Sequence, residues 1–167
     1  VKGLFGEKLV ERGLRKLNTA DYHVFHDFYL PRPDGEGTTQ IDHLVVSRFG
    51  LFVIETKNYQ GWIFGGEKQR QWTQSINKTK HKFQNPLHQN ALHINALAKF
   101  LGVDKKQCHN IVFFIGDCTL KNEIPFNVMT RGLLPFIQKH QTALLSEERV
   151  EDSLKKLESL PAGSDKS

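Results

Sequence analysis

The chain has 167 residues, a length typical of one domain that buries more than half of its unfolded surface. Its formal net charge is +5 at pH 7, and no run approaches the roughly 18 apolar residues of a membrane span, which argues against an integral membrane protein. Cys108 and Cys118 lack the C-x-x-C spacing of zinc and redox motifs, and no secretory signal is visible, so we expect a cytoplasmic location. The first residue is Val1, which leaves open a further domain or an anchor at either end.

In the first half of the chain, apolar periodicity and turn residues predict one helix followed by strands. The helix is expected over 4–17, where apolar residues recur at near-helical spacing. The strands are expected at 22–30, in a hairpin over 39–58, and as two short strands at 62–64 and 71–75. Segments rich in proline and glycine separate them and are typical of turns.

The second half is predicted to contain three helices and two strands. Asn85 and Pro86 mark the N-cap and the first residue of a helix that ends before Gly102. Strands are expected at 110–116 and 127–130. Two further helices are expected at 132–140 and 147–159, and Ser146 caps the second of them. A disordered tail is expected at 161–167. The main order, α-β-β-β-α-β, predicts a single α/β domain over 1–160 whose mixed sheet carries helices on both faces.

The segment 40–58, QIDHLVVSRFGLFVIETKN, carries the most informative chemistry. Side chains alternate faces along a strand, so Glu55 and Lys57 share a face. A hairpin with a two-residue turn at its centre pairs Asp42 with Glu55, and directly opposed residues have Cβ atoms roughly 4.5–5.5 Å apart. Gly50 offers a second register, because a three-residue loop would shift the pairing by one residue and turn Asp42 to the opposite face.

Two carboxylates and a lysine at this spacing suit metal-dependent chemistry at a phosphate. Mg²⁺ prefers oxygen ligands, so one or two carboxylates, phosphate oxygens and water make a sufficient site. Bound metal lowers the pKa of a water ligand, and a nearby lysine orients that water or stabilises the charge that develops on the phosphate. The competing interpretation is a solvated ion pair worth under about 1 kcal/mol. The continuous apolar run at 51–54 disfavours it, because such runs are typical of strands buried on both faces.

The sequence also resembles a known family, the nuclease-related domain called NERD, which belongs to the PD-(D/E)xK nuclease superfamily. The residues that carry the resemblance are GLFGE at 3–7, QIDH at 40–43, GLFVIETKN at 50–58, Gly61, Asn85-Pro86 and Gln89-Asn90. It covers about residues 3–130, and the expected helices at 131–160 lie outside it. Ile41 stands where the superfamily's name has proline. The resemblance implies a restriction-endonuclease-like mixed-sheet core.

The resemblance also implies roles for individual side chains. Asp42 and Glu55 would be metal ligands and Lys57 the catalytic lysine, while Glu7 would reach the site from the first helix. We expect the carbonyl oxygen of Thr56 to complete the ligand set for Mg²⁺ or Mn²⁺.

Four further residues have more than one interpretation. Gly6 would let the first helix approach the site, although Glu7 in the first helical turn would equally complement the helix dipole. Gln89 and His93 are either exposed to solvent or directed to the site. The resemblance favours the site for Gln89, because a glutamine in the corresponding helix has such a role in several relatives, whereas His93 is expected to be solvent-exposed. Gln40 shares the face of Asp42 by parity and is therefore expected to contact substrate or orient a ligand. That assignment extends the proposed site along the strand.

Basic residues concentrate in 56–106, a segment that contains nine Lys or Arg residues and only two Asp or Glu residues. An extended strand would direct alternate lysines to one side, and we expect three of them to contact a nucleic-acid backbone: Lys78, Lys80 and Lys82. The alternative is an ordinary solvated face. Trp62 and Trp72 are interpreted as core or β-ribbon packing and not as base-stacking platforms.

Together these features predict a metal-dependent nuclease that hydrolyses phosphodiester bonds, with DNA favoured over RNA as substrate. The alternatives are a non-catalytic DNA-binding module or a protein-interaction module on the same fold. The sequence leaves open whether cleavage is internal or terminal, which strandedness or sequence is preferred, which pathway is served, and whether the protein acts as a homodimer.

Overall fold

Two β-sheets form the framework of the computed structural model, which describes residues 2–121 and 123–161. The larger sheet has five strands in the order β1-β2-β3-β7-β9. Their bounds are β1 (His23–Pro31), β2 (Thr38–Ser47), β3 (Gly50–Asn58), β7 (Cys108–Ile115) and β9 (Val128–Met129). Strands β1, β2 and β3 pair antiparallel, whereas β7 pairs parallel with both β3 and β9. The sheet is therefore mixed, as predicted.

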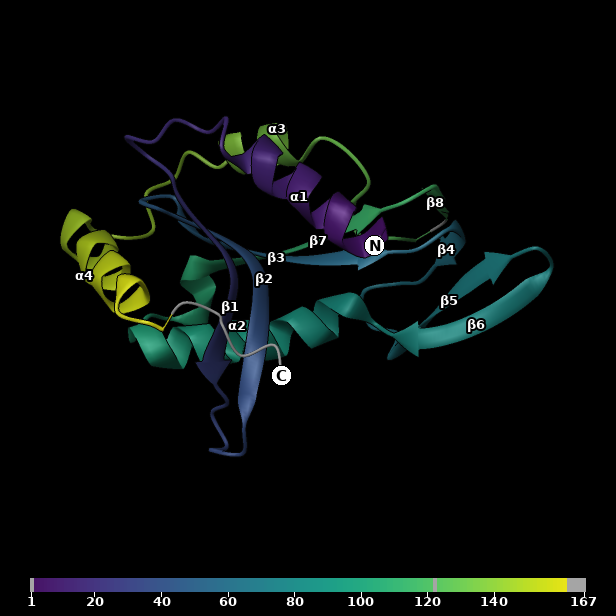
Figure 1. The fold of residues 1–167 in the computed structure, drawn as a ribbon, viewed down its shortest axis with the longest axis horizontal. Helices are drawn as coiled ribbons and strands as arrows, with labels where there is room; N and C mark the ends of the chain where they lie inside the picture. The colour runs from purple at the N-terminus through teal and green to yellow at the C-terminus, as the bar shows by residue number, and fades with distance from the viewer. Residues whose placement is uncertain (1, 122, 162–167) are drawn as a thin grey trace.

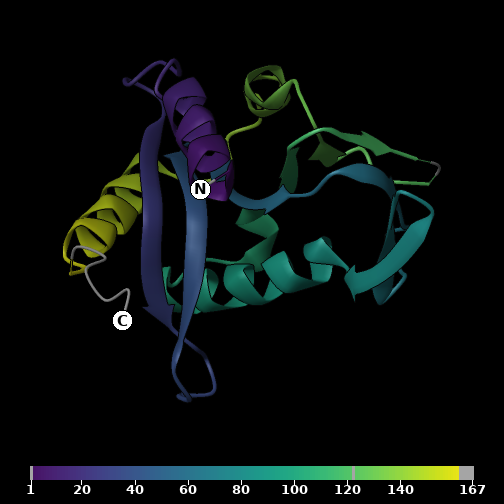
Figure 2. The same cartoon turned by 45° about the vertical axis from the view of Figure 1, so that its right-hand side comes forward.

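Helices cover both faces of the five-stranded sheet, with α1 and α3 on one face and α2 and α4 on the other (Figures 1 and 2). The helices are α1 (Lys2–Leu14), α2 (Pro86–Leu101), α3 (Leu133–Gln138) and α4 (Glu147–Glu158), with a 3-10 turn, η1 (Lys105–Gln107), before β7. Each face has its own apolar core. Phe52 and Ile54 of β3 belong to the core under α1, and Leu51 and Val53 to the core over α2. The predicted α-β-β-β-α-β order is confirmed.

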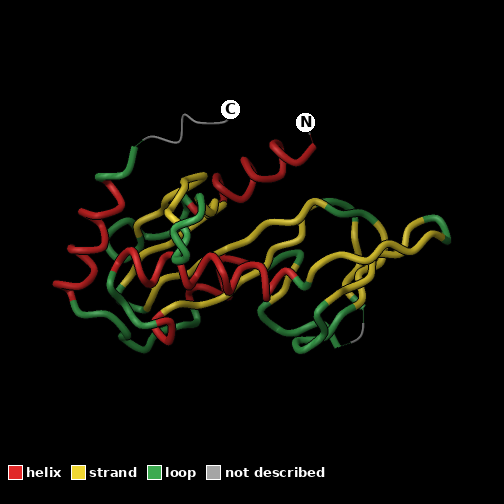
Figure 3. Tube along the Cα trace, turned by 90° about the horizontal axis from the view of Figure 1, so that it is seen from below, coloured by secondary structure: helices red, strands yellow, loops and turns green. Residues whose placement is uncertain are grey.

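A second, four-stranded sheet lies at one end of the molecule (Figures 1 and 3). Its strands are β4 (Gly61–Phe64), β5 (Gln71–Ile76), β6 (Thr79–Gln84) and β8 (Cys118–Leu120), in the order β6-β5-β4-β8. Its inner face packs on the start of α2 and on β7 through Ile63 and Trp72, both fully buried. Trp72 therefore lies in the core as predicted, whereas Trp62 has 52% of its surface exposed and lies outside the core, on the β-sheet surface beside Phe64.

The β2–β3 hairpin has the register that a two-residue turn predicts. Its pairs run from Ser47 opposite Gly50 to His43 opposite Ile54. Gly50 has a φ angle of 119°, and a Cβ atom added there would lie 2.8 Å from the backbone oxygen of Gln107. Gly50 thus allows its backbone to lie close to the backbone of Gln107. The alternative register with a three-residue loop is not formed.

Helix α2 begins and ends at the residues that its capping signals predict. The Asn85 side chain accepts a hydrogen bond from the backbone N–H of Leu87, and Pro86 occupies the first helical position. Gly102 follows the helix in the left-handed conformation, with a φ angle of 68°. These caps set the ends of the helix that carries Gln89.

Other boundaries differ from prediction. Helix α1 begins at Lys2 and ends at Leu14, and β6 and β8 were not predicted as separate strands. Pro135 is the third residue of α3. The first N–H groups of a helix have no acceptor within it, so a proline at this position costs no helical hydrogen bond. The predicted tail lies outside the described residues apart from Pro161. Among the described helices, none has the length and apolar character needed to cross a bilayer.

We expect Gly50→Ala to destabilise the protein by about 2–4 kcal/mol, because the substitution combines an unfavourable φ angle with contact against Gln107 and His109. Gly35→Ala is the matched control, since Gly35 also has a positive φ angle but nothing within 4 Å of the added Cβ. It should cost only about 1 kcal/mol. Urea denaturation measures both free energies of unfolding. Equal losses in the two variants would contradict a packing role for Gly50.

Candidate functional site

Strand β3 presents polar side chains to both faces of the sheet at its C-terminal end. Because Leu51 and Val53 face α2, the alternation of side chains places Glu55 and Lys57 on the same side, and Thr56 on the side of α1. Glu55 is buried, with 6% of its surface exposed, and Thr56 has 8% exposed. A buried carboxylate at this position requires specific polar partners.

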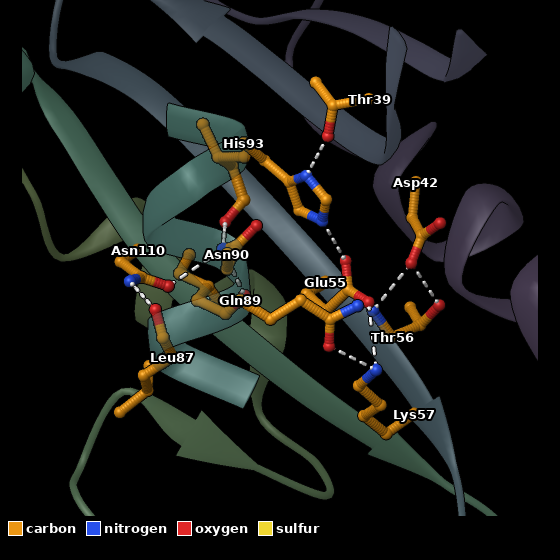
Figure 4. A network of polar contacts seen from close by, with 12 residues as sticks. Thr39, Asp42, Glu55, Thr56, Lys57, Leu87, Gln89, Asn90, His93 and Asn110 are labelled. Carbon is orange, nitrogen blue, oxygen red and sulfur yellow. Dashed lines mark hydrogen bonds and ion pairs between the residues drawn. The ribbon is translucent and has the colours of Figure 1, made fainter. Parts of the chain in front are cut away.

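On the α2 side, Glu55 and Lys57 meet two side chains from α2 (Figure 4). Lys57 Nζ lies 3.3 Å from Glu55 Oε1 and donates a 2.7 Å hydrogen bond to Gln89 Oε1. His93 Nε2 lies 3.3 Å from Glu55 Oε2, and its Nδ1 lies 2.6 Å from Thr39 Oγ1. The structure therefore brings Gln89 to the predicted position beside the lysine.

The expectation that His93 is solvent-exposed is wrong, because its side chain is only 13% exposed and contacts Glu55. Residues four apart on a helix lie one above the other, so Gln89 and His93 reach the same strip of β3. Ala96, one turn further along the same helix, has 1% of its surface exposed. Helix α2 is covered more broadly than its apolar stripe indicates, because it contacts both the large sheet and α4.

Asn90 holds α2 against the junction of β3 and β7 (Figure 4). Its side-chain amide donates to the backbone oxygen of Val53 at 2.9 Å, to Asn110 Oδ1 at 2.8 Å and to the backbone oxygen of Ile111 at 3.3 Å. Asn110 in turn donates to the backbone oxygen of Leu87. These bonds set the position of the two functional side chains on either side of Asn90 in the helix.

On the α1 side, Asp42 and Glu7 converge on Thr56. The Asp42 carboxylate accepts hydrogen bonds of 3.0 Å from both the backbone N–H and the hydroxyl of Thr56, and Glu7 Oε1 lies 3.3 Å from the same hydroxyl. A Cβ atom on Gly6 would lie 2.3 Å from Ile115 Cδ1, so glycine is required for the close approach of α1. Because α1 begins at Lys2, Glu7 lies in its second turn, beyond the positions that best complement the helix dipole.

Asp42 and Glu55 occupy the next position beyond the last paired residues of β2 and β3. Asp42 nevertheless contacts Thr56 on the α1 side while Glu55 contacts His93 on the α2 side, so the expectation that the two carboxylates share a face is wrong. Burial, together with the negative charges of Glu55 and Glu7, raises the pKa of Asp42 to about 6, although the hydrogen bonds from Thr56 act to lower it. The site therefore holds three neighbouring carboxyl groups with Lys57 as the cation beside them. Such an excess of buried negative charge favours the binding of a cation.

The donor set fits a hard divalent cation. Asp42 and Glu55 supply carboxylate oxygens, and Mg²⁺ needs only one or two carboxylates when water and phosphate oxygens complete its coordination. Within residues 2–121 and 123–161, no three His, Cys, Asp or Glu side chains are arranged to hold a metal by themselves. Further ligands would therefore have to come from the Thr56 carbonyl, from water and from the substrate.

The regular alternation of β1 and β2 breaks at Asp27 and Asp42, which lie opposite each other and are skipped in the ladder. Asp27 has a φ angle of 51°, and Ile41 and Leu44 point to the same face across the break. Gln40 donates its side-chain amide to Asp27. Gln40 thus bonds to the residue opposite Asp42 at this distortion, and its role in contacting substrate or orienting a ligand stays a prediction.

The predicted backbone-contacting lysines lie on the β5–β6 hairpin and not in the carboxylate cluster. Lys80 and Lys82 are exposed on β6, and Lys78 lies in the turn with a φ angle of 65°. The hairpin projects from the end of the molecule (Figure 1). Lys82 Nζ donates to Thr73 Oγ1 across the hairpin. The structure therefore separates these three lysines from Lys57.

Replacing Asp42 by asparagine should stabilise the metal-free protein at alkaline pH. A folded-state pKa of about 6, above the usual 3.8, means that the folded state holds the proton more tightly, so stability is lost as pH rises through this range. The loss corresponds to ~3 kcal/mol, and asparagine avoids it because it carries no charge.

Urea denaturation of both proteins should show a difference in free energy of unfolding that grows from near zero at about pH 4 to ~3 kcal/mol at about pH 8. Asp152→Asn on α4 controls for loss of a carboxylate outside the cluster. A difference between wild type and Asp42→Asn that does not change with pH would contradict the burial and repulsion of Asp42.

Comparison with known proteins identifies the family of the chain. The sequence profile of the nuclease-related domain, NERD, matches residues 2–115. An uncharacterized protein of Bacillus anthracis is 48% identical over 120 residues, which cover 72% of this chain and 56% of that protein, so the chain spans about half the length of this curated relative. No solved structure shows a significant match. Because the profile covers more than half of the sequence, the chain belongs to the nuclease-related domain family, within the restriction-endonuclease-like superfamily.

Proposed function

We propose that this protein is a metal-dependent nuclease that hydrolyses phosphodiester bonds, with DNA as the favoured substrate. The observation that carries the proposal is the convergence of Asp42, Glu55 and Lys57 at the end of β3, in a chain of the nuclease-related family. Mg²⁺ or Mn²⁺ held by the two carboxylates would supply Lewis acid chemistry that polarises a phosphate oxygen and acidifies water.

The protein's own contribution is to hold Lys57 beside the place where charge develops. Glu55 lies on one side of the ammonium group and Gln89 accepts a hydrogen bond from it on the other. The side chain is 18% exposed, so its charge acts in a partly desolvated site, where electrostatic interactions are stronger than in water. From this position Lys57 orients the attacking water or stabilises the developing negative charge.

The remaining contacts orient the carboxylates. Thr56 donates two hydrogen bonds to Asp42, and His93, itself bonded to Thr39, holds the far oxygen of Glu55. Such partners of metal-binding carboxylates set their orientation and charge. Glu7 adds a third carboxylate within reach of Thr56 and supports the same cation or its water ligands.

Cleavage of plasmid and linear DNA, followed by gel electrophoresis, tests the proposal. Wild-type protein should cut in Mg²⁺ or Mn²⁺ and stop in EDTA, and Lys57→Ala should lower the rate about 10²–10³-fold, the usual loss for removing one group that stabilises transition-state charge. Lys155→Ala, an exposed lysine on α4, should cut at the wild-type rate. Cleavage in EDTA would overturn the proposal, and DNA binding without cleavage in any metal would favour the non-catalytic module.

His93→Ala should weaken binding of Mn²⁺ about 10–100-fold, since it removes the partner that orients Glu55. Isothermal titration of the protein with Mn²⁺ measures this directly, without any cleavage assay. His88→Ala is the matched control, because His88 is on the same helix but exposed. Equal affinities in the two histidine variants would show that His93 plays no part in orienting Glu55.

A further inference from the structure

The four-stranded sheet has one buried face and one open face. Ile63, Trp72 and Phe83 lie on the inner face and belong to the apolar core beneath it. Residues paired across neighbouring strands share a face, so the outer face follows from the register of the sheet. It places Trp62 beside Ser75 on one side and Thr119 on the other.

The same register extends the outer face to the edge of the sheet. Phe64 pairs with Thr73 and Thr73 with Lys82, while Ser75 pairs with Lys80. Two aromatic rings at the centre of the face are thus followed by hydroxyl groups and then by two lysines on β6. The four strands contain no Asp or Glu, and the neighbouring acids are in the connecting segments, at Glu67, Asp117 and Glu123.

Trp62 is the unusual feature of this face. The ring of Phe64 lies 6.3 Å from its own in an edge-to-face arrangement, and Lys121 Nζ lies 4.3 Å from its centroid. Even with these contacts, 52% of Trp62 is exposed, whereas the other tryptophan, Trp72, is fully buried. Lys121 continues β8, because its backbone N–H donates to the Ile63 oxygen, so a second cationic edge borders the aromatic centre.

An exposed aromatic surface with two lysines on one side and a third, Lys121, on the other suits one class of ligand. Bases of single-stranded nucleic acid stack on exposed aromatic rings while lysines track the phosphates. Lysines on an edge strand also protect it from pairing with other chains, and this explains Lys80 and Lys82 on β6. It explains Lys121 beside the other edge strand, β8, in the same way, but it does not explain the exposed Trp62 on a central strand, so the nucleic-acid interpretation accounts for more of the surface.

The face is also close enough to the proposed active site to share one ligand. Strand β4 follows β3 directly, and the five residues from Lys57 to Trp62 span at most about 18 Å. We propose that the outer face of the four-stranded sheet binds a single-stranded segment of the nucleic-acid substrate, with a base stacked on Trp62. Phosphates then lie against Lys80, Lys82 and Lys121. The proposal rests on the proposed nuclease function and names the form of its substrate.

Binding in EDTA tests this surface separately from cleavage. The probe is a fluorescein-labelled oligodeoxythymidylate of about twelve nucleotides, followed by fluorescence anisotropy. Trp62→Ala should weaken its binding about 5- to 100-fold, the range expected for loss of one base–aromatic stack. Phe126→Ala is the matched control, since Phe126 is 80% exposed, also lies near a lysine, and belongs to a different surface. It should bind as wild type does.

Tryptophan emission provides an independent readout, because the chain has only two tryptophans. Binding of unlabelled oligodeoxythymidylate should quench the emission of the wild-type protein. In Trp62→Phe, which keeps an aromatic ring at this position, the quenching should disappear, because the remaining Trp72 is fully buried. Replacing Lys80 and Lys82 together by alanine should reduce the slope of log affinity against log salt by about 1.4.

Equal affinity of wild type and Trp62→Ala for the oligonucleotide would overturn the proposal, as would tighter binding of a hairpin duplex of the same length. Self-association of the wild type that is lost in Trp62→Ala, without oligonucleotide binding, would instead assign the face to a second copy of the chain. If the wild-type protein cleaves DNA in metal but Trp62→Ala leaves its affinity for the oligonucleotide unchanged, this inference alone is overturned. Trp62-dependent binding with no cleavage in any metal would overturn only the nuclease function.

Discussion

The register of β2 against β3 is the constraint on which the site depends. A slip of one residue would exchange the faces of β3 and move Glu55 and Lys57 from α2 to α1. Tertiary bonds hold the turn in place: His109 of β7 bonds to one turn carbonyl, and the backbone N–H groups of 144–145 donate to the other. Gly50 makes this anchoring sterically feasible. The chemistry at one end of the hairpin therefore rests on packing at the other.

The second requirement is that α2 lie at one position along β3. Asn90 secures this by bonding to backbone oxygens of both central parallel strands, so that the helix cannot slide without losing buried hydrogen bonds. Gln89 and His93 then reach Lys57 and Glu55 from one side, while α1 delivers Glu7 from the other. The site is thus assembled around a single strand by two helices from opposite faces of the sheet.

The molecule keeps two kinds of charge apart. Carboxylates gather where burial strengthens their repulsion, an arrangement that a divalent cation would relieve. Lysines gather on the exposed second sheet, where an ammonium group remains hydrated and can exchange its counterions for phosphates. In the proposed nuclease, the buried cluster performs the chemistry and the exposed sheet holds the polymer. Cleaving a polyanion requires both, and the separation keeps the lysines of the second sheet away from the carboxylates, where Lys57 already pairs with Glu55.

The sequence by itself determined the features that depend on neighbouring residues. The strand alternation of 51–57 and the caps of α2 follow from local conformational preferences, and they placed the β3 motif and α2 correctly. Only the tertiary structure decided which faces are covered. It buried His93 against Glu55, broke the alternation at Asp42, and left Trp62 open. Periodicity reports which side chains share a face, but burial is set by whatever packs on that face, and those partners are distant in sequence.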